Sequence, residues 1–428
     1  METVTHIVTF NANMPLNREY NCDAFTTFAL KVVRELLKVG RKVIVLGTSS
    51  TGPQDLNQYN RYGYVSCLQD EDFKEQEGIV ELNSPLYLTH KNDTTLSQTM
   101  KSIRQEKYMK QVHCFIREQL SFPNKLIYLL HGYYEAENIH YYNDFKDPSS
   151  RFFSIHLMAM GGILNFPFQR TIFCSQSYYS LMFIEKLKNN NYYLELNQPV
   201  QTVRIHAPFF DEEDFIYSSE KENYYLYLGR IQFEKGFYYI LKIALHYPNL
   251  RFKIGAPFIT IEQGDKKVLC LFHDSDWSRN VKKEFPELTL LKKEETFILE
   301  HIPNVELLGY QDKKARAHLL SKAKMLIQPS LYHEPFGFNV IEAYLSGTEV
   351  LTTNFGTFIE TVPKGLGLSK RCETEEEFYE QILLKENALP EQQKEASQQC
   401  YNFGLKYTTK KLAASFLTLL DEMWNLQH

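Results

Sequence analysis

The chain contains 428 residues and carries a formal net charge of −5 at neutral pH. This length exceeds the size at which a single hydrophobic core stops growing, so we expect two domains. Hydrophobic residues make up 43% of the chain and charged residues 23%, which is typical of a globular protein and excludes a disordered one. Because the net charge is slightly negative, no overall basic field attracts nucleic acid, and we expect no nucleic-acid partner.

The cysteines and the N-terminal residues bear on the compartment. The 7 cysteines are scattered and include no C-x-x-C pair, which argues against a disulfide framework and a zinc site and favours a reducing environment. Residues 1–10 lead directly into a strand-like run and lack the charged and apolar regions of a signal peptide. No apolar run reaches the roughly 20 residues that span a bilayer. These features predict a cytoplasmic protein.

The N-terminal half alternates short β-branched runs with helical patterns. Residues 23–40 place Phe28, Val32 and Leu36 at helical spacing, and Gly40 follows where a C-cap glycine is expected. With the strands before and after it, this segment predicts a β-α-β unit of a parallel sheet. The strands expected in this half are residues 6–10, 42–47, 125–130, 170–175 and 202–206.

The polar residues 211–223 interrupt this alternation and predict the linker between two domains, at 1–212 and 213–409. A second α/β series follows, and the chain ends in an amphipathic helical pattern. Residues 256–300 are charged and irregular, which favours an insertion or loops there. Two doubly wound domains are the economical architecture, with ligands at the carboxyl ends of the strands. The later strands are expected at residues 224–229, 250–255, 305–310, 325–330 and 349–354.

The most informative segment is residues 329–362. A strand ends at Ser330, a loop carries Glu334, and a helix begins near Gly337, where the missing Cβ lets a ligand approach the backbone. The first N–H groups of a helix lack intrahelical partners and can bind a phosphate. Glu342 follows about one turn into the helix, where a carboxylate can accept hydrogen bonds from ribose hydroxyls.

A second segment, residues 225–244, places two cations after a strand. Gly229 ends the strand, Arg230 follows it, and Lys235 and Gly236 precede a helix. Arginine can bind a diphosphate through two parallel hydrogen bonds, whereas lysine acts as a point charge. Because these two cations would neutralise a departing diphosphate, we expect no metal ion and no other cofactor.

Together the two segments resemble the retaining glycosyltransferases of family 4, also called glycosyl transferases group 1. The resemblance rests on the G-R-x5-K-G pattern from Gly229 to Gly236 and the E-x7-E pattern from Glu334 to Glu342. It implies the GT-B fold, in which two Rossmann-like α/β domains face each other across a cleft. It also implies that the terminal helix, residues 410–428, packs back on the first domain.

The resemblance implies how a nucleoside-diphosphate sugar would bind as the donor substrate. Arg230 and Lys235 would hold its diphosphate. The distal phosphate would be held by the backbone N–H groups at the start of the helix, those of Phe338, Asn339 and Val340. The acceptor would be a carbohydrate, a lipid or another glycan, and the anomeric configuration would be retained.

The same resemblance implies the remaining roles. Glu342 would bind the ribose, and Glu334 would contact the sugar near the reacting carbon. His131, at the end of a strand in the first domain, matches the position of the family's active-site histidine. From the residues alone, a histidine at a strand end can equally be a hydrogen-bonded core residue.

The sequence departs from the family pattern in four places. Residues 11–21 lack the usual glycine pair after the first strand, and residues 206–208 replace the usual Asn-Gly before the linker. Glu349 stands where the family has proline, and Thr357 replaces the second glycine of a later pair. None of these changes removes a charged donor contact, but the first two weaken any inference about the acceptor.

Two further patterns have simpler explanations. The D-x-D matches at residues 70–72 and 274–276 would hold a metal ion in the other major glycosyltransferase fold, but their polar surroundings indicate surface loops. Residues 101–120 carry a basic stripe at helical spacing. Weak peripheral contact with an anionic membrane fits this stripe, and a solvated helix face is the commoner outcome.

Two other functions stay open beside glycosyl transfer. A nucleotide-sugar epimerase or hydrolase would keep the same fold and act without an acceptor. A catalytically idle carbohydrate- or nucleotide-binding module would bind without turnover. A nucleotide-dependent dehydrogenase is disfavoured because no G-x-G-x-x-G follows the first strand. The sequence does not select the base, the sugar or the acceptor.

Overall fold

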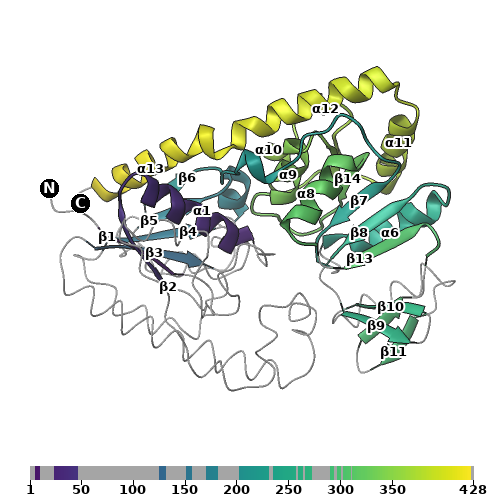
Figure 1. The fold of residues 1–428 in the computed structure, drawn as a ribbon, viewed down its shortest axis with the longest axis horizontal. Helices are drawn as coiled ribbons and strands as arrows, with labels where there is room; N and C mark the ends of the chain where they lie inside the picture. Colours follow the sequence, from purple (N-terminus) through teal and green to yellow (C-terminus); the bar gives the residue numbers. More distant parts are fainter. Residues whose placement is uncertain are drawn as a thin grey trace. The chain divides into compact units, whose positions relative to one another are not determined.

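The computed structural model describes thirteen segments of the chain (Figure 1), namely residues 5–9, 24–46, 125–131, 151–156, 170–181, 202–230, 235–256, 259–263, 266–271, 290–293, 296–299, 302–309 and 311–425. They form two compact units. The N-terminal unit holds the described residues up to Phe210 and those from Tyr407 onward, and the C-terminal unit holds those of Asp211–Lys406. The chain therefore passes into the C-terminal unit at Asp211, the start of the predicted linker, and returns to the N-terminal unit at Tyr407.

The N-terminal unit is built on a parallel sheet with the order β2-β1-β3-β4-β5-β6. Since β1 lies between β2 and β3, the strand order reverses beside β1, which is the doubly wound topology. The fourth strand was not anticipated from the sequence. The strands are β1 (Thr5–Thr9), β2 (Lys42–Leu46), β3 (Lys125–His131), β4 (Arg151–His156), β5 (Arg170–Phe173) and β6 (Thr202–Ile205).

Helix α1 (Ala24–Lys38) connects β1 to β2 and buries the apolar face predicted from its periodicity. Phe28, Val32 and Leu36 are each 1% exposed. The helix ends at Lys38, and Gly40 follows it with a φ of 75°, in the left-handed region that glycine enters at low cost. This confirms the β-α-β unit that the sequence predicts.

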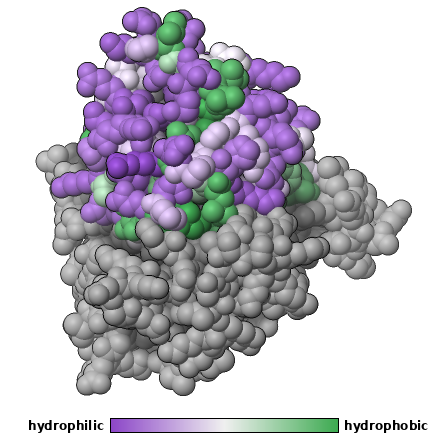
Figure 2. Space-filling view, turned by 90° about the vertical axis from the view of Figure 1, so that its right-hand side faces the viewer, coloured by the Kyte–Doolittle hydropathy of each residue, from purple (hydrophilic) through white to green (hydrophobic). Residues whose placement is uncertain are grey.

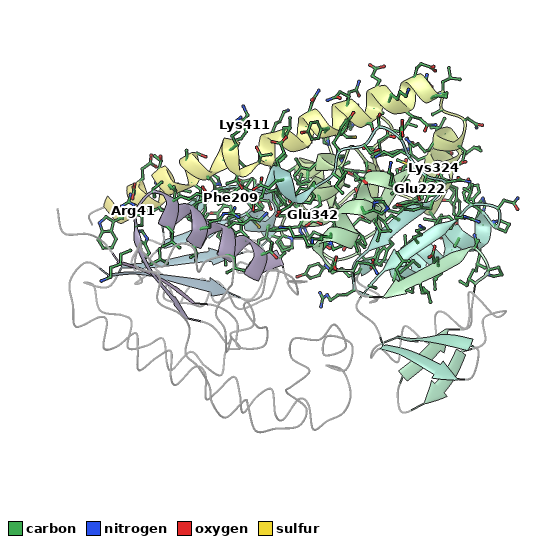
Figure 3. All side chains as sticks on the ribbon, viewed as in Figure 1. Arg41, Phe209, Glu222, Lys324, Glu342 and Lys411 are labelled. Carbon is green, nitrogen blue, oxygen red and sulfur yellow. The ribbon has the colours of Figure 1, made fainter. Side chains whose placement is uncertain are left out.

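The last helix, α13 (Thr409–Asn425), shares a core with α1. The Phe28 ring packs edge-on against Phe209 and Phe416, with centroids 5.0 and 5.8 Å apart. Arg41, just after α1 and labelled in Figure 3, donates hydrogen bonds of 2.7 and 2.8 Å to the carboxylate of Asp421. The end of the chain thus contributes to the core of the N-terminal unit.

The C-terminal unit contains a second parallel sheet, with the order β13-β8-β7-β14-β15-β16. Its strand order reverses between β7 and β14. Strand β14 ends two residues before the predicted Ser330, because Pro329 has no N–H to continue the ladder. The strands are β7 (Tyr225–Leu228), β8 (Phe252–Gly255), β13 (Val305–Gly309), β14 (Met325–Gln328), β15 (Glu349–Thr353) and β16 (Lys370–Cys372).

The central strands of this sheet are buried along their whole length. All four residues of β7 and all four of β14 are buried, as expected where helices cover both faces of a parallel sheet. The Tyr225 and Phe252 rings stack across β7 and β8, 5.6 Å apart. The helices of this unit are α6 (Phe237–His246), α8 (Lys313–Lys322), α9 (Phe338–Leu345), α10 (Phe358–Thr361), α11 (Glu375–Glu386) and α12 (Pro390–Gly404).

Within residues 256–300, where the sequence favours an insertion or loops, the structure contains a small antiparallel sheet between β8 and β13, with the order β11-β12-β10-β9. Its strands are β9 (Ile259–Gln263), β10 (Lys266–Leu271), β11 (Leu290–Lys293) and β12 (Thr296–Leu299). Only Gly264 and Asp265 separate β9 from β10 in the sequence, a spacing typical of a two-residue hairpin. The predicted insertion is therefore a β-structure.

The surface shown in Figure 2 is mostly hydrophilic where it is coloured, with hydrophobic residues in scattered groups. In the described part of the chain, no helix is both long and apolar enough to cross a membrane. The basic stripe at 101–120 and the D-x-D matches at 70–72 and 274–276 lie outside the described residues, so those interpretations stay predictions.

Candidate functional site

The candidate site lies at the carboxyl edge of the C-terminal sheet, where the strand order reverses. Strands β7 and β14 are parallel neighbours, with Met325 opposite Tyr225 and Leu326 opposite Leu226. The loops that follow these two strands consequently leave the sheet at the same edge. A reversal of strand order leaves a crevice between such loops, and ligands of doubly wound sheets bind there.

Two residues predicted from the sequence meet at this edge. The Lys235 ammonium Nζ lies 2.7 Å from Oε1 of Glu334, although the residues are 99 apart in the sequence. Their side chains are 13% and 14% exposed. Ser330 Oγ also donates to Glu334 Oε1 at 3.0 Å, and the ammonium lies 4.5 Å from the centre of the Tyr332 ring. The loops after β7 and β14 thus form one partly buried charged cluster.

Gly236 explains why this cluster can form. Its φ is 68°, and a Cβ built there would lie 1.7 Å from the carbonyl oxygen of Pro329. Any larger residue would force the start of α6 away from the end of β14, and would move Lys235 with it. The glycine of the G-R-x5-K-G pattern is therefore required by close backbone approach.

Helix α9 presents its N-terminus at the same edge. Its N-cap is Gly337, with a φ of 76° and no side-chain cap, and a Cβ there would lie 3.0 Å from the Phe358 ring. The Phe338 ring packs edge-on against Phe336, 5.8 Å away. The Val340 N–H already donates to the Gly337 carbonyl at 3.0 Å. An anion bound at this N-terminus would therefore approach the backbone ahead of Val340.

A connected set of side-chain hydrogen bonds holds the first turns of α9 in place. Asn339 donates to the Leu228 carbonyl at 2.6 Å and to Gln328 Oε1 at 3.3 Å, so its side chain ties α9 to the ends of β7 and β14. Arg316 Nη2 donates to Asn339 Oδ1 at 3.0 Å and to Glu342 Oε2. The sequence did not point to Arg316, which the fold brings from α8.

Arg230 lies in the loop after β7, with an exposed side chain. Tyr227 anchors its backbone, because the tyrosine hydroxyl donates to the Arg230 carbonyl at 2.7 Å. Within the described part of the chain, the guanidinium makes no hydrogen bond or ion pair. It is therefore available to a ligand at the same edge as Lys235.

His131 belongs to the N-terminal unit, where it is the last residue of β3 and pairs in register with His156 of β4. It thus stands at the carboxyl edge of its own sheet, while its imidazole lies outside the described side chains. The loop at residues 11–21 also lies outside the description. Among the described residues, no group of three or more His, Cys, Asp or Glu could hold a metal ion.

Comparison with known proteins identifies a similar family and similar folds. Residues 209–400 match the family model described as Glycosyl transferases group 1. A curated relative is an uncharacterized 42.6 kDa protein in the cps region of Klebsiella pneumoniae, 27% identical over 186 residues. The match covers 40% of this chain and 41% of that protein. The chain therefore matches less than half of the length of this relative.

Solved structures match over nearly the whole chain. Sucrose-phosphate synthase from Thermosynechococcus elongatus has a TM-score of 0.63 at 12% identity, covering 99% of this chain and 100% of that one. HepE from Anabaena, in complex with UDP and glucose, has a TM-score of 0.62 at 11% identity, covering 98% and 100%. A glycosyltransferase from Rickettsia africae has a TM-score of 0.59 at 9% identity, covering both chains fully, 100% and 100%.

At such low identities these likenesses establish the fold. The family match contains Lys235, Glu334 and Glu342, the residues that the structure brings to one sheet edge. The matched family model is that of glycosyl transferases, and the solved structures include a glycosyltransferase. The chain has the GT-B fold of these glycosyltransferases, and its residues 209–400 resemble the glycosyl transferases group 1.

Proposed function

We propose that this chain transfers a sugar from a nucleoside-diphosphate sugar to a carbohydrate, lipid or other glycan acceptor, with retention and without a metal ion. The observation that carries the proposal is the meeting of Lys235 and Glu334 at the reversal point of the C-terminal sheet, where Asn339 also ties the helix that carries Glu342 to the end of β7. A cation, two carboxylates and a helix N-terminus gathered there suit the diphosphate, ribose and sugar of one donor.

The main catalytic contribution would be stabilisation of the negative charge that develops on the departing diphosphate. Arg230, Lys235 and the N-terminus of α9 would hold the diphosphate and neutralise the charge that develops as its bond to the anomeric carbon breaks. The acceptor oxygen bonds to that carbon on the face that the diphosphate leaves. The acceptor proton passes to the departing phosphate oxygen, so the configuration is retained and no protein nucleophile is consumed.

The resemblance assigns the sugar to Glu334 and His131. Glu334 would exchange its hydrogen bond from Lys235 for hydroxyls of the donor sugar when the diphosphate engages that lysine. Replacing His131 by alanine should lower turnover and leave the affinity for free nucleoside diphosphate unchanged. Equal losses of turnover and diphosphate affinity would remove His131 from the sugar subsite.

Two related structures suggest where to begin with the donor. Structures of Anabaena HepE contain UDP with glucose and UDP-glucose. UDP-sugars are therefore the first donors to offer, followed by GDP- and ADP-sugars. This choice rests on a similar fold at low identity, so the base and the sugar are decided by the assay.

The proposal is tested by slow turnover of nucleotide sugars in EDTA. Wild-type protein should release nucleoside diphosphate from one donor, and faster when an acceptor extract is added, whereas Glu334→Ala should release none. Proton NMR of the first product would give its anomeric configuration. Release of free sugar that no acceptor accelerates would favour a hydrolase, an epimerised nucleotide sugar would favour an epimerase, and binding without turnover would favour an idle binding module.

A further inference from the structure

We propose that Arg316 is a positioning residue for nucleotide recognition, which holds the Glu342 carboxylate in the orientation that accepts a ribose hydroxyl. This inference deepens the proposed function and rests on it. No pattern in the sequence marks Arg316.

The backbone at Arg316 is fixed by the start of α8. Asp312 caps this helix, because its Oδ1 accepts a 2.8 Å hydrogen bond from the Ala315 N–H. The Arg316 N–H in turn donates to the Asp312 carbonyl at 2.9 Å. Arg316 therefore extends from the first turn of a capped helix, from which its side chain crosses to α9.

The guanidinium then joins two acceptors on α9. Nη2 of Arg316 donates to Asn339 and to Glu342, which lie on neighbouring turns of that helix. Asn339 is itself held by the Leu228 carbonyl at the end of β7. Glu342 is thus connected through Arg316 and Asn339 to the end of β7, at the candidate site.

Partial burial makes the attraction between Arg316 and Glu342 stronger than that of a surface ion pair. The Arg316 and Glu342 side chains are 24% and 16% exposed, so solvent screens their attraction less than between fully exposed charges. The carboxylate also avoids the cost of ordering a free glutamate side chain when a ligand binds.

The pairing leaves Glu342 suited to a sugar hydroxyl near a phosphate. Oε2 is occupied by Arg316, whereas Oε1 makes no hydrogen bond to another described side chain. A lone carboxylate would repel a nearby diphosphate, and the guanidinium offsets that repulsion. Arg316 would therefore fix the orientation of Glu342 and reduce its electrostatic cost.

A purely structural role, joining α8 to α9, makes a different prediction. Loss of a structural contact would lower the affinity for every nucleotide by the same factor. Loss of a positioning contact would instead abolish the preference for nucleotides that carry ribose hydroxyls. The ratio of the Kd values for 2′-deoxy or 3′-deoxy nucleoside diphosphate and for the ribose form separates the two roles.

The experiment measures that ratio by calorimetry for Arg316→Met, Glu342→Gln and wild type, with Lys314→Ala as the control. Lys314 is an exposed cation in the same turn of α8. We expect about a tenfold preference for the ribose form in wild type and Lys314→Ala. The ratio should fall towards one in Glu342→Gln and Arg316→Met, and Arg316→Lys should restore part of it.

Each outcome is decisive. A wild-type ratio in Arg316→Met, with the ratio lost in Glu342→Gln, would overturn the inference and leave the proposed function intact. Absence of binding of any nucleoside diphosphate to wild type would instead overturn the proposed function, and the inference with it. If Arg316→Met does not fold, Arg316→Gln serves in its place, because an uncharged glutamine forms no ion pair with Glu342, and the ratio should again fall below the wild-type value.

Discussion

The Lys235 ammonium and the Glu334 carboxylate form a 2.7 Å ion pair between the loops after β7 and β14. The proposed function assigns Lys235 to the diphosphate of the donor and Glu334 to its sugar. On that proposal a diphosphate would compete with Glu334 for the ammonium, and its charge would meet a carboxylate directly beside it. The ion pair would then oppose the binding of a free nucleoside diphosphate.

Removing the Glu334 charge should strengthen diphosphate binding while abolishing transfer. We expect Glu334→Gln to bind the free nucleoside diphosphate several-fold more tightly than wild type, because Lys235 loses its competing partner. Lys235→Ala should bind about tenfold or more weakly. Calorimetry measures both affinities, and a Glu334→Gln variant that binds more weakly than wild type would contradict competition for Lys235.

Gly236 should tolerate no side chain. Gly236→Ala adds a Cβ that would lie 1.7 Å from the Pro329 carbonyl at a φ of 68°, so we expect a loss of about 2–4 kcal/mol in the free energy of unfolding and weaker diphosphate binding. Gly365→Ala is the matched control, since its φ is 79° but no atom lies within 4 Å of its Cβ. The control should lose only about 1 kcal/mol. Similar losses in denaturant titrations of the two variants would refute the close-approach argument.

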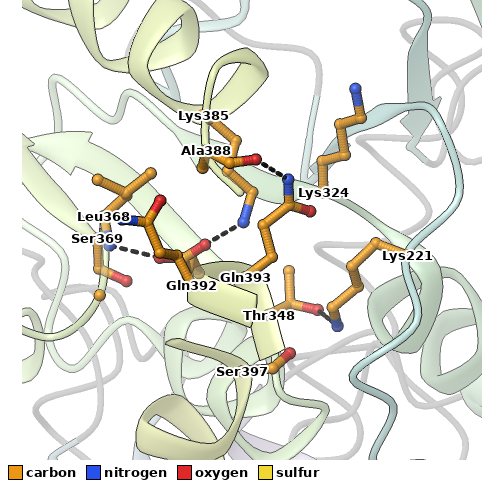
Figure 4. A network of polar contacts seen from close by, with 12 residues as sticks. Lys221, Lys324, Thr348, Leu368, Ser369, Lys385, Ala388, Gln392, Gln393 and Ser397 are labelled. Atoms are coloured by element: carbon orange, nitrogen blue, oxygen red, sulfur yellow. Dashed lines mark hydrogen bonds and ion pairs between the residues drawn. The ribbon is translucent and has the colours of Figure 1, made fainter. Parts of the chain in front are cut away.

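Glu349, which replaces the family proline, forms a buried ion pair with Lys385 (Figure 4). The two side chains are 2% and 3% exposed, and the other carboxylate oxygen accepts from the Leu368 N–H. Removing one partner leaves an uncompensated buried charge, so Glu349→Leu should destabilise the C-terminal unit by about 3–5 kcal/mol. Adding Lys385→Met should recover much of that loss. A double variant as unstable as the sum of the single variants would show that the charges are not coupled.

Lys221 should make stability depend on pH. Its ammonium donates to Thr348 Oγ1 (Figure 4). It also donates to the Ser321 and Ser346 carbonyls. Burial lowers the pKa of Lys221 from 10.5 to about 7, while the neighbouring charges act in both directions. Between these values the unfolded chain binds more protons than the folded one, so this lysine's contribution to stability rises with pH from about 7 to 10.5 and is lowest below pH 7.

Lys221→Met should remove that dependence. At pH 7 the free energy of unfolding of the variant should exceed that of wild type, by an amount on the order of a few kcal/mol. The difference should shrink as the pH rises towards 10. Lys364→Met, at an exposed lysine, should change neither value. Denaturant titrations at both pH values provide the measurement. An identical slope of stability against pH in Lys221→Met and wild type would show that Lys221 does not titrate in this range.

Much of the C-terminal site could be predicted because local rules specify it. Strand, glycine and helix start follow each other within a few residues at Gly236 and again at Gly337, and each step has a backbone reason. The order of parallel strands then brings Lys235 and Glu334 together without further information. The two motifs thus predict loops at strand ends, and the pairing of β7 with β14 brings these loops to a common edge.

Other features depend on contacts that no local pattern records. Arg316 acts across α8 and α9, and nothing around it in the sequence indicates that these helices meet at their first turns. The Asn339 side chain likewise anchors strand ends, whereas the resemblance concerned only its backbone. The β9–β12 sheet was missed because its strands are short and its lysine pairs resemble loop sequence, although the Gly264-Asp265 pair was a usable hairpin signal.

On the proposed function, the carboxyl edge of the C-terminal sheet binds the nucleotide of a sugar donor. The experiment that checks this is thermal unfolding with UDP, GDP, ADP and their sugars in EDTA, for wild type, Lys235→Ala, Glu342→Ala and the control Lys314→Ala. We predict that one nucleotide series raises the Tm of wild type and Lys314→Ala by several degrees, and that both site variants lose most of this rise. No rise with any nucleotide, or an equal rise in all four proteins, would contradict the claim.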